Sequence, residues 1–170
     1  MATGSSARTL NLPGFDSDRV LTAVDALMNP EKVQGDLVII GGGLTGIEIA
    51  YEYARKGNHV TVLEAMDKYL NVDLAAANRN FLLSAVELYH IDLHVNAKVG
   101  AFADGSVTYT DPEGEHSVKA DTVIVSIGYN SEKSLADELD GDYVHVIGDA
   151  DHVSNLMGAI WQAYETAMKL

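Results

Sequence analysis

Three glycines at a fixed spacing are the residues of this chain that point most directly to chemistry. Gly41, Gly43 and Gly46 fill the pattern G-x-G-x-x-G, directly after the apolar run Leu37–Ile40. In such a turn the first glycine permits a tight bend, the second lets a pyrophosphate approach the backbone, and the third lets the following helix pack closely. The N–H groups and the positive dipole end of that helix then face the phosphates.

A distant acid strengthens this interpretation. Glu64 follows the apolar run Val60–Leu63 and lies eighteen positions after Gly46. A carboxylate at this spacing accepts hydrogen bonds from an adenosine ribose and repels a 2′-phosphate. No arginine occupies residues 65–67, which favours NADH over NADPH, and Lys68 is the nearest cation. We therefore predict a dinucleotide site; the alternatives are a purely structural turn and a solvated strand end.

Other residues of the glycine segment are expected to contact the same ligand. Gly42, Leu44 and Thr45 lie within the turn and are predicted to line the cofactor. Glu48 lies on the first turn of the helix, where an acid also gains from the helix dipole. Its two interpretations, a cofactor contact and simple helix-end electrostatics, carry equal weight.

The remaining polar residues show no second constellation. The six histidines (His59, His90, His94, His116, His145 and His152) lack metal-ligand spacing. His90 and His94 are four positions apart, but the residues between them indicate a strand, on which the two rings would not converge on one ion. We predict no metal site and no catalytic side chain.

Apolar periodicity predicts the elements that position the glycine turn. The continuous runs Leu37–Ile40 and Val60–Leu63 are typical of strands covered on both faces. A helix from Leu44 is expected to end at Gly57. The further predictions are helices over residues 20–28, capped at 16–18, and over 75–89, with Phe81, Leu82, Ala85 and Leu88 buried; strands over 91–95, 122–127 and 143–149; and a hairpin with arms 102–110 and 116–120.

These elements predict an α/β fold. We expect a Rossmann-like parallel sheet with helices on both faces and an antiparallel β excursion along one edge. The last helix, over residues 154–170, is apolar on two stripes. Leu156, Ile160, Ala163 and Ala167 form one stripe, and Met157, Trp161, Tyr164 and Met168 form the other. A helix that is apolar on two faces needs partners on both, which predicts a homodimer or a missing domain.

Composition limits the classes of partner. The chain has 170 residues, a length typical of one domain, and a net charge of −14 without a basic cluster. Nucleic acid and anionic membranes are therefore unfavourable partners. No segment has the apolar length of a membrane span or of a signal peptide, and we expect a cytoplasmic location. Without cysteine, the chain can form neither a disulfide nor an iron–sulfur ligand set.

Short motifs near both ends carry a family resemblance. They are Ala2-Thr3-Gly4, Leu12-Pro13-Gly14, the turn 127–130 and Gly148-Asp149. With the glycine turn, they make the chain similar to the FAD/NAD(P)H pyridine nucleotide-disulfide oxidoreductase superfamily, in which an NAD domain is inserted in an FAD domain. Residues 20–27, 43–50 and 159–167 most resemble the C-terminal part of 2-enoate and 2,4-dienoyl-CoA reductases.

The resemblance implies a division of the chain. Residues 1–32 would be a connector and the edge of a missing FAD domain, 33–141 the NAD(H)-binding domain, and 142–170 the returning strand and helix of the FAD domain. Gly128 would let the backbone approach a cofactor, and Gly148 and Asp149 would hold the flavin. The FAD glycine motif, the FMN barrel and the cysteines of a [4Fe–4S] centre are absent, so the chain resembles a fragment.

The resemblance also implies an activity. In the parent, NADH would pass hydride to FAD, and electrons would reach an activated alkene through the iron–sulfur centre and FMN. The isolated chain is expected to bind NADH weakly and to catalyse nothing. Two rivals are a non-catalytic NAD-sensing regulatory Rossmann module and an adenosyl-methionine methyltransferase. The first does not need the motifs near the chain ends, and the second usually carries an acid before the glycine turn.

Overall fold

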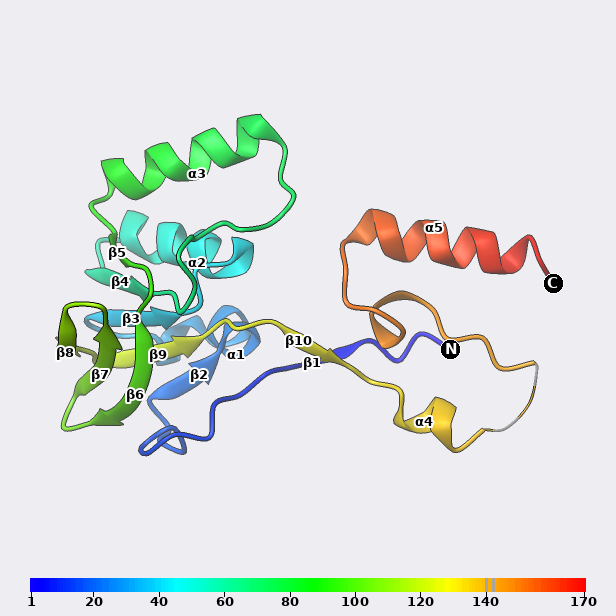
Figure 1. Ribbon diagram of the computed structural model, residues 1–170, viewed down its shortest axis with the longest axis horizontal. Helices are drawn as coiled ribbons and strands as arrows, with labels where there is room; N and C mark the ends of the chain where they lie inside the picture. The colour runs from blue at the N-terminus through cyan, green and yellow to red at the C-terminus, as the bar shows by residue number, and fades with distance from the viewer. Residues whose placement is uncertain (140, 142) are drawn as a thin grey trace. The chain divides into compact units, whose positions relative to one another are not determined.

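The computed structural model describes residues 1–139, 141 and 143–170, which form two compact units (Figure 1). The larger unit is Arg8–Ile127, and the smaller unit combines Met1–Ala7 with Gly128–Leu170. The resemblance implies boundaries at residues 32 and 141 instead. The assignment of either part to a cofactor remains a prediction.

The larger unit is built on a parallel sheet of five strands in the order β2-β9-β3-β4-β5. All four pairings of neighbouring strands are parallel. The strands are β2 (Val20–Thr22), β3 (Leu37–Ile40), β4 (Val60–Leu63), β5 (Asp92–His94) and β9 (Thr122–Val125). Every residue of β3, β4 and β9 is buried, as the continuous apolar runs predict.

Helices cover one face of this sheet. They are α1 (Ala23–Met28), the short 3₁₀ helix η1 (Pro30–Lys32), α2 (Leu44–Arg55) and α3 (Ala76–Leu88). Ile47 and Ala50 of α2 pack with Leu37, Ile39 and Val62 of the strands. In α3, Leu82 and Ala85 are buried as predicted, whereas Phe81 and Leu88 are exposed. The contacts of α3 are mainly with α2, so a narrower apolar stripe is enough.

A three-stranded antiparallel sheet covers the other face. Its strands are β6 (Lys98–Ala103), β7 (Ser106–Asp111) and β8 (Gly114–Lys119). Val38 and Leu63 of the parallel sheet share one core with Phe102, Val107 and Tyr109 of the antiparallel sheet. The α/β class and the existence of an antiparallel excursion are confirmed, but the excursion covers a face of the parallel sheet and not one edge, as was expected. The expectation of helices on both faces is corrected, because alternate residues of these strands supply the second apolar surface.

Two local predictions are wrong, one because of a turn and the other because of strand pairing. Asp104 and Gly105 both have positive φ, and this Asp-Gly turn splits the predicted arm 102–110 into β6 and β7. Residues 20–22 form β2 rather than helix, because they pair with β9. The helix begins after Thr22, whose side chain forms a capping box with Asp25.

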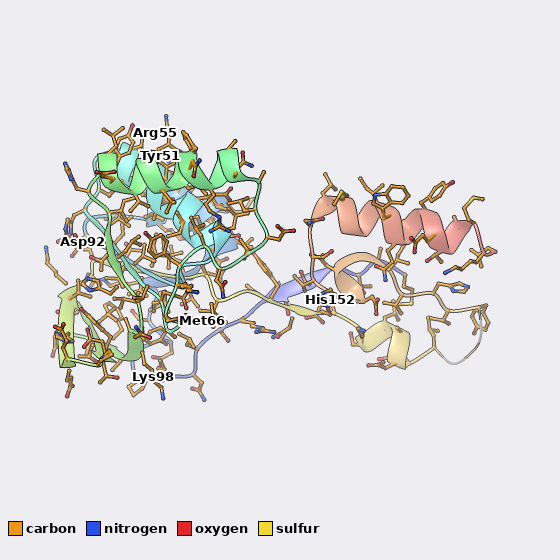
Figure 2. The ribbon with its side chains drawn as sticks, turned by 45° about the horizontal axis from the view of Figure 1, so that its top comes forward. Tyr51, Arg55, Met66, Asp92, Lys98 and His152 are labelled. Carbon is orange, nitrogen blue, oxygen red and sulfur yellow. The ribbon has the colours of Figure 1, made fainter. Side chains whose placement is uncertain are left out.

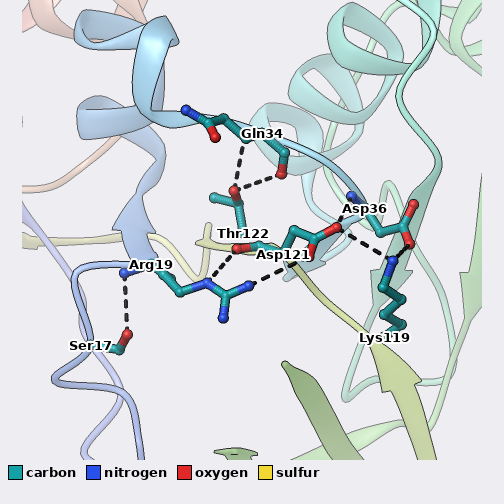
Figure 3. A network of polar contacts seen from close by, with 7 residues as sticks. All are labelled: Ser17, Arg19, Gln34, Asp36, Lys119, Asp121 and Thr122. Atoms are coloured by element: carbon teal, nitrogen blue, oxygen red, sulfur yellow. Dashed lines mark hydrogen bonds and ion pairs between the residues drawn. The ribbon is translucent and has the colours of Figure 1, made fainter. Parts of the chain in front are cut away.

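A polar network joins the amino ends of β2, β3 and β9 to the carboxyl end of β8 (Figure 3). The Asp121 carboxylate accepts a hydrogen bond from the Asp36 N–H at 2.9 Å, and the Asp121 carbonyl accepts one from Arg19 Nε at 2.9 Å. Lys119 Nζ lies 2.9 Å from the Asp36 carboxylate. The Asp36 N–H, with Lys119 and Arg19, holds the pKa of Asp121 below its ordinary value. These groups tie β2, β3, β8 and β9 together.

The smaller unit has a two-stranded antiparallel sheet, β1 (Ser5–Ala7) with β10 (Tyr129–Ser131), a short α4 (Ser134–Asp137), a 3₁₀ turn η2 (Gly148–Ala150) and α5 (Leu156–Ala167). The predicted last helix is therefore confirmed. The predicted strand over 143–149 is wrong, since residues 143–147 form no strand. In the described residues, this segment pairs with no strand. Its backbone partner is Met1, whose amino group donates to the His145 carbonyl and whose carbonyl accepts from the Ile147 N–H. In the described part of the chain, no helix has the length and apolarity of a membrane crossing.

Candidate functional site

The candidate site lies at the carboxyl ends of the parallel strands in the larger unit. From β3 the chain proceeds to β4 and β5 on one side, and it later returns to β9 on the other side. The carboxyl ends of β3 and β9 therefore flank the point where the strand order reverses. Ligands of open α/β sheets bind at such a switch point. The glycine turn follows β3 there, and Ser126 follows β9.

Close contacts explain two of the glycines. Gly41 has a φ of +106°, and a Cβ at this position would stand 2.2 Å from the Ser126 carbonyl oxygen. A Cβ at Gly46 would stand 2.0 Å from the Gly41 carbonyl oxygen. Any side chain would therefore push β9 away from the turn or α2 away from β3. These contacts match the tight bend and the close helix packing predicted from the sequence.

The middle of the turn is open. A Cβ at Gly43 would meet no atom within 4 Å. Gly43 is also the N-cap of α2, and its carbonyl accepts the first helical hydrogen bond from the Ile47 N–H at 3.1 Å. The N–H groups of Leu44, Thr45 and Gly46 precede this ladder and have no partner within the helix. An anion above Gly43 would meet these groups and the positive end of the helix dipole.

Glu64 is buried beside the glycine turn, with 7% of its surface exposed. Its Oε2 accepts a hydrogen bond from the Gly42 N–H at 2.6 Å, and its Oε1 accepts one from the Met66 N–H at 2.8 Å. A carboxylate has about four lone-pair sites, so acceptor capacity remains for ligand hydroxyls. The sequence predicts the position of Glu64 but not these internal hydrogen bonds.

Glu48 lies on the exposed face of α2 and lines a groove of about 270 Å³ between α2 and α3. Leu44 and Tyr51 line the α2 side, and Leu74, Asn78, Phe81 and Leu82 line the other side. The sequence analysis did not anticipate this groove, because it depends on how α3 packs against α2. Tyr51 and Phe81 meet there edge to face, with ring centroids 5.4 Å apart.

The other predicted site residues belong to the smaller unit. Gly128 has a φ of +94° with open space at its Cβ position. The Gly148 N–H donates to Gln162 Oε1 at 2.7 Å. The Asp149 carboxylate accepts hydrogen bonds from the Ser154 N–H at 3.1 Å and from the Ser5 hydroxyl at 3.4 Å. Gly148 and Asp149 therefore link β1, η2 and the start of α5.

The histidines take part in local contacts. His94 ends β5, and its Nδ1 lies 3.4 Å from the Tyr109 hydroxyl. His116 Nε2 lies 2.9 Å from the Asp111 carboxylate. Within the described ranges, no three His, Cys, Asp or Glu side chains are grouped so that they could hold a metal ion.

Comparisons with known proteins agree with this geometry. The family described as pyridine nucleotide-disulphide oxidoreductase matches residues 1–149. The cinnamate reductase of Clostridium sporogenes is 39% identical over 175 residues, covering 100% of this chain and 26% of that protein. The NADH oxidase of Thermoanaerobacter brockii is 28% identical over 180 residues, covering 100% of this chain and 27% of that protein.

A solved structure extends the similarity to three dimensions. A 2-naphthoyl-CoA reductase in complex with 2-naphthoyl-CoA superposes with a TM-score of 0.89 at 26% sequence identity. The superposition covers 99% of this chain and 26% of that one. The chain thus spans about a quarter of the length of these relatives.

Proposed function

The chain belongs to the pyridine nucleotide-disulphide oxidoreductase family, and on that basis we propose that its larger unit binds NADH for hydride transfer to FAD. The observation that carries the proposal is the open glycine turn with the Glu64 carboxylate against it, at the switch point of the sheet. In this proposal the nicotinamide and the flavin supply the redox chemistry, and the protein binds and orients them.

Backbone groups would hold the pyrophosphate. A chain with a net charge of −14 repels a dianion at long range, so local positive potential is needed. The first N–H groups of α2 and its dipole provide that potential without a basic side chain. The open space at Gly43 fits the close approach of phosphate oxygens to the backbone.

Glu64 would hold the adenosine ribose. Its buried carboxylate is already oriented by the Gly42 and Met66 N–H groups, so little side-chain freedom is lost on binding. The same charge would repel a 2′-phosphate. We therefore propose NADH rather than NADPH as the ligand.

Gly148 and Asp149 would contribute to a flavin site in a longer protein. Each Asp149 oxygen accepts one hydrogen bond within the smaller unit, which leaves acceptor capacity for a ligand hydroxyl. A [4Fe–4S] centre would be held by other parts of that protein, because this chain has no cysteine. FMN would be held by the barrel that the family resemblance implies. The exposed apolar face of α5 would contact the missing FAD domain.

The proposed parent reaction is the reduction of an activated alkene. One relative supports this substrate class by name, the cinnamate reductase, because cinnamate carries an alkene conjugated to a carboxylate. The isolated chain is proposed to bind NADH and to turn over no substrate. Steady oxidation of NADH by this chain in the presence of cinnamate would contradict that statement.

Calorimetric titration with NADH, NADPH and FAD tests the binding proposal. We expect saturable NADH binding, at least about tenfold weaker NADPH binding, and no FAD binding. The Glu64→Gln variant keeps the shape but loses the charge, so NADH affinity should fall about tenfold. Glu115→Gln, at an exposed position on β8, is the matched control and should leave NADH affinity unchanged. Absence of saturable NADH binding would contradict the proposal.

A further inference from the structure

The loop between β4 and α3, residues 65–75, contains one buried anchor. Leu70 is 1% exposed, although residues 65–68 and 71–73 around it are exposed. Leu70 also has a φ of +51°, a left-handed conformation that residues other than glycine rarely adopt. Such a conformation persists only where the surrounding structure enforces it.

Arg79 supplies part of that enforcement. Its Nη1 donates to the Leu70 carbonyl at 2.8 Å, and its Nη2 donates to the Val72 carbonyl at 2.7 Å. The planar guanidinium thus binds two carbonyls of the loop at once. A lysine ammonium has no such fork and cannot reproduce this geometry.

The position of Arg79 near the N-terminus of α3 is unfavourable for a cation, and its hydrogen bonds to the loop offset this cost. Arg79 is the fourth residue of α3, close to the positive end of the helix dipole, where a cation is unfavourable. The first turn of α3 carries no acidic residue to offset it. The two carbonyls of the loop are therefore its compensating partners.

The anchored loop reaches the glycine turn directly. The Leu70 N–H donates to the Gly42 carbonyl at 2.7 Å. A Cβ at Gly42 would stand 2.9 Å from the Tyr69 Cβ, so Tyr69 lies against the turn. The Gly42 N–H in turn donates to Glu64, and the Met66 N–H brings the start of the loop back to the same carboxylate.

We propose that Arg79 is a positioning residue for the nucleotide site. Through Leu70 it holds Gly42, and through Gly42 and Met66 it fixes the Glu64 carboxylate. The inference rests on the proposed NADH function of the site and names a residue that sets its preference for NADH.

The test compares Arg79→Lys and Arg79→Met with a matched control, Arg55→Lys. Arg55 lies on α2 next to Tyr51 (Figure 2) and forms an exposed ion pair with Glu52 at 2.8 Å. Two quantities are measured: amide hydrogen exchange at Gly42, Met66 and Leu70, and the affinities for NADH and NADPH.

In Arg79→Lys we expect exchange at these three amides to become at least about tenfold faster, while the amides of β9 keep their protection. NADH affinity should fall about tenfold, because Glu64 is less fixed, and NADPH affinity should fall less. Arg79→Met should show the same pattern more strongly. Arg55→Lys should change neither quantity.

Unchanged exchange at Gly42 and Met66 in Arg79→Lys would overturn the inference, whether or not the chain binds NADH. A purely structural role would also overturn it: exchange would rise across the whole unit, and the ratio of NADH to NADPH affinity would stay constant. Absence of NADH binding by the unaltered chain would contradict the proposed function. The exchange rates at Gly42, Met66 and Leu70 would still test whether Arg79 positions the glycine turn. If Arg79→Met does not fold, Arg79→Lys decides alone.

Discussion

The two units of this chain differ in what holds them together. In the larger unit, two buried apolar clusters lie on opposite faces of the parallel sheet. In the smaller unit, Ala150 is the sole buried apolar residue among those described, and no residue of α5 is buried. Both units contain helices and strands. The presence of secondary structure therefore does not tell a unit with a buried apolar core from a unit that lacks one.

The helix α5 illustrates the difference. Gly158, Ala159 and Gln162 are half-buried. The Gln162 side chain accepts a hydrogen bond from the Gly148 N–H and donates one to the Asp151 carboxylate. The opposite side exposes Leu156, Met157, Ile160, Trp161, Tyr164 and Met168. The two apolar stripes predicted from the sequence thus leave one continuous apolar face in solvent. Faces of this kind mark interaction sites.

Hydrogen exchange gives the largest expected contrast between the units. We expect the amides of β3 and β9 to be protected about a thousandfold or more beyond those of α5, because opening β3 or β9 exposes the larger unit's core. The measurement is amide exchange of the whole chain at low protein concentration. Equal protection in both units would contradict the comparison.

A pair of glycine variants sharpens the description of the larger unit. Gly46→Ala places a Cβ against the Gly41 carbonyl and should lower the free energy of unfolding by about 2–3 kcal/mol. Gly43→Ala meets open space and should cost about 1 kcal/mol or less. Denaturant unfolding measures both, and similar losses for the two variants would refute the packing argument. Gly43→Ala should nevertheless weaken NADH binding.

The exposed face of α5 predicts self-association. The helix and the three residues after it carry only Glu165 and Lys169 as charged side chains, so two acidic chains can meet there without strong repulsion. Trp161→Glu should raise the dimer dissociation constant about thirtyfold in sedimentation experiments. Phe81→Glu is a matched control, since Phe81 is 56% exposed and Trp161 is 57% exposed. A monomer at high concentration would contradict the prediction.

A buried hydroxyl makes the core of the larger unit less stable than it could be. Thr61 lies in β4 with 1% exposure, and its Oγ1 has no hydrogen-bond partner among the described residues. Thr61→Val removes the unpaired group and should raise the free energy of unfolding by about 1 kcal/mol. The exposed Thr110→Val on β7 should change it by less than about 0.5 kcal/mol. Destabilisation by Thr61→Val would show that the hydroxyl is satisfied.

The smallest expected effect is a change in how the stability of the larger unit depends on pH. The pKa of Asp121 is lowered in the folded chain by the Asp36 N–H and nearby cations. A carboxyl with a lowered folded pKa contributes stability above its unfolded pKa, and this contribution is lost as pH falls through the folded pKa. Asp121→Asn should therefore be less stable near neutral pH and lose less stability below about pH 4. Asp137→Asn in the smaller unit is the control, and parallel pH profiles for Asp121→Asn and the unaltered chain would contradict the prediction.

Where the sequence carries a strong local signal, its predictions are confirmed. The strands β3 and β4 and the helix α2 lie where the apolar runs and Gly57 place them. The strand over 20–22 was missed because three residues hold no periodicity, and only pairing with β9 makes them β2. The groove beside Glu48 and the contacts of Arg79 were also missed, since they join residues from separate elements.

The sequence alone determined the family, the glycine turn and the acid at the end of β4, because these depend on residue type and spacing along the chain. Only the tertiary structure decided that an antiparallel sheet covers the second face and that Glu64 is bound by Gly42 and Met66. It also decided that Arg79 reaches Leu70 and that α5 keeps its apolar face exposed. Local patterns determine the conformation of a segment, whereas burial and side-chain partners depend on which distant segments pack against it.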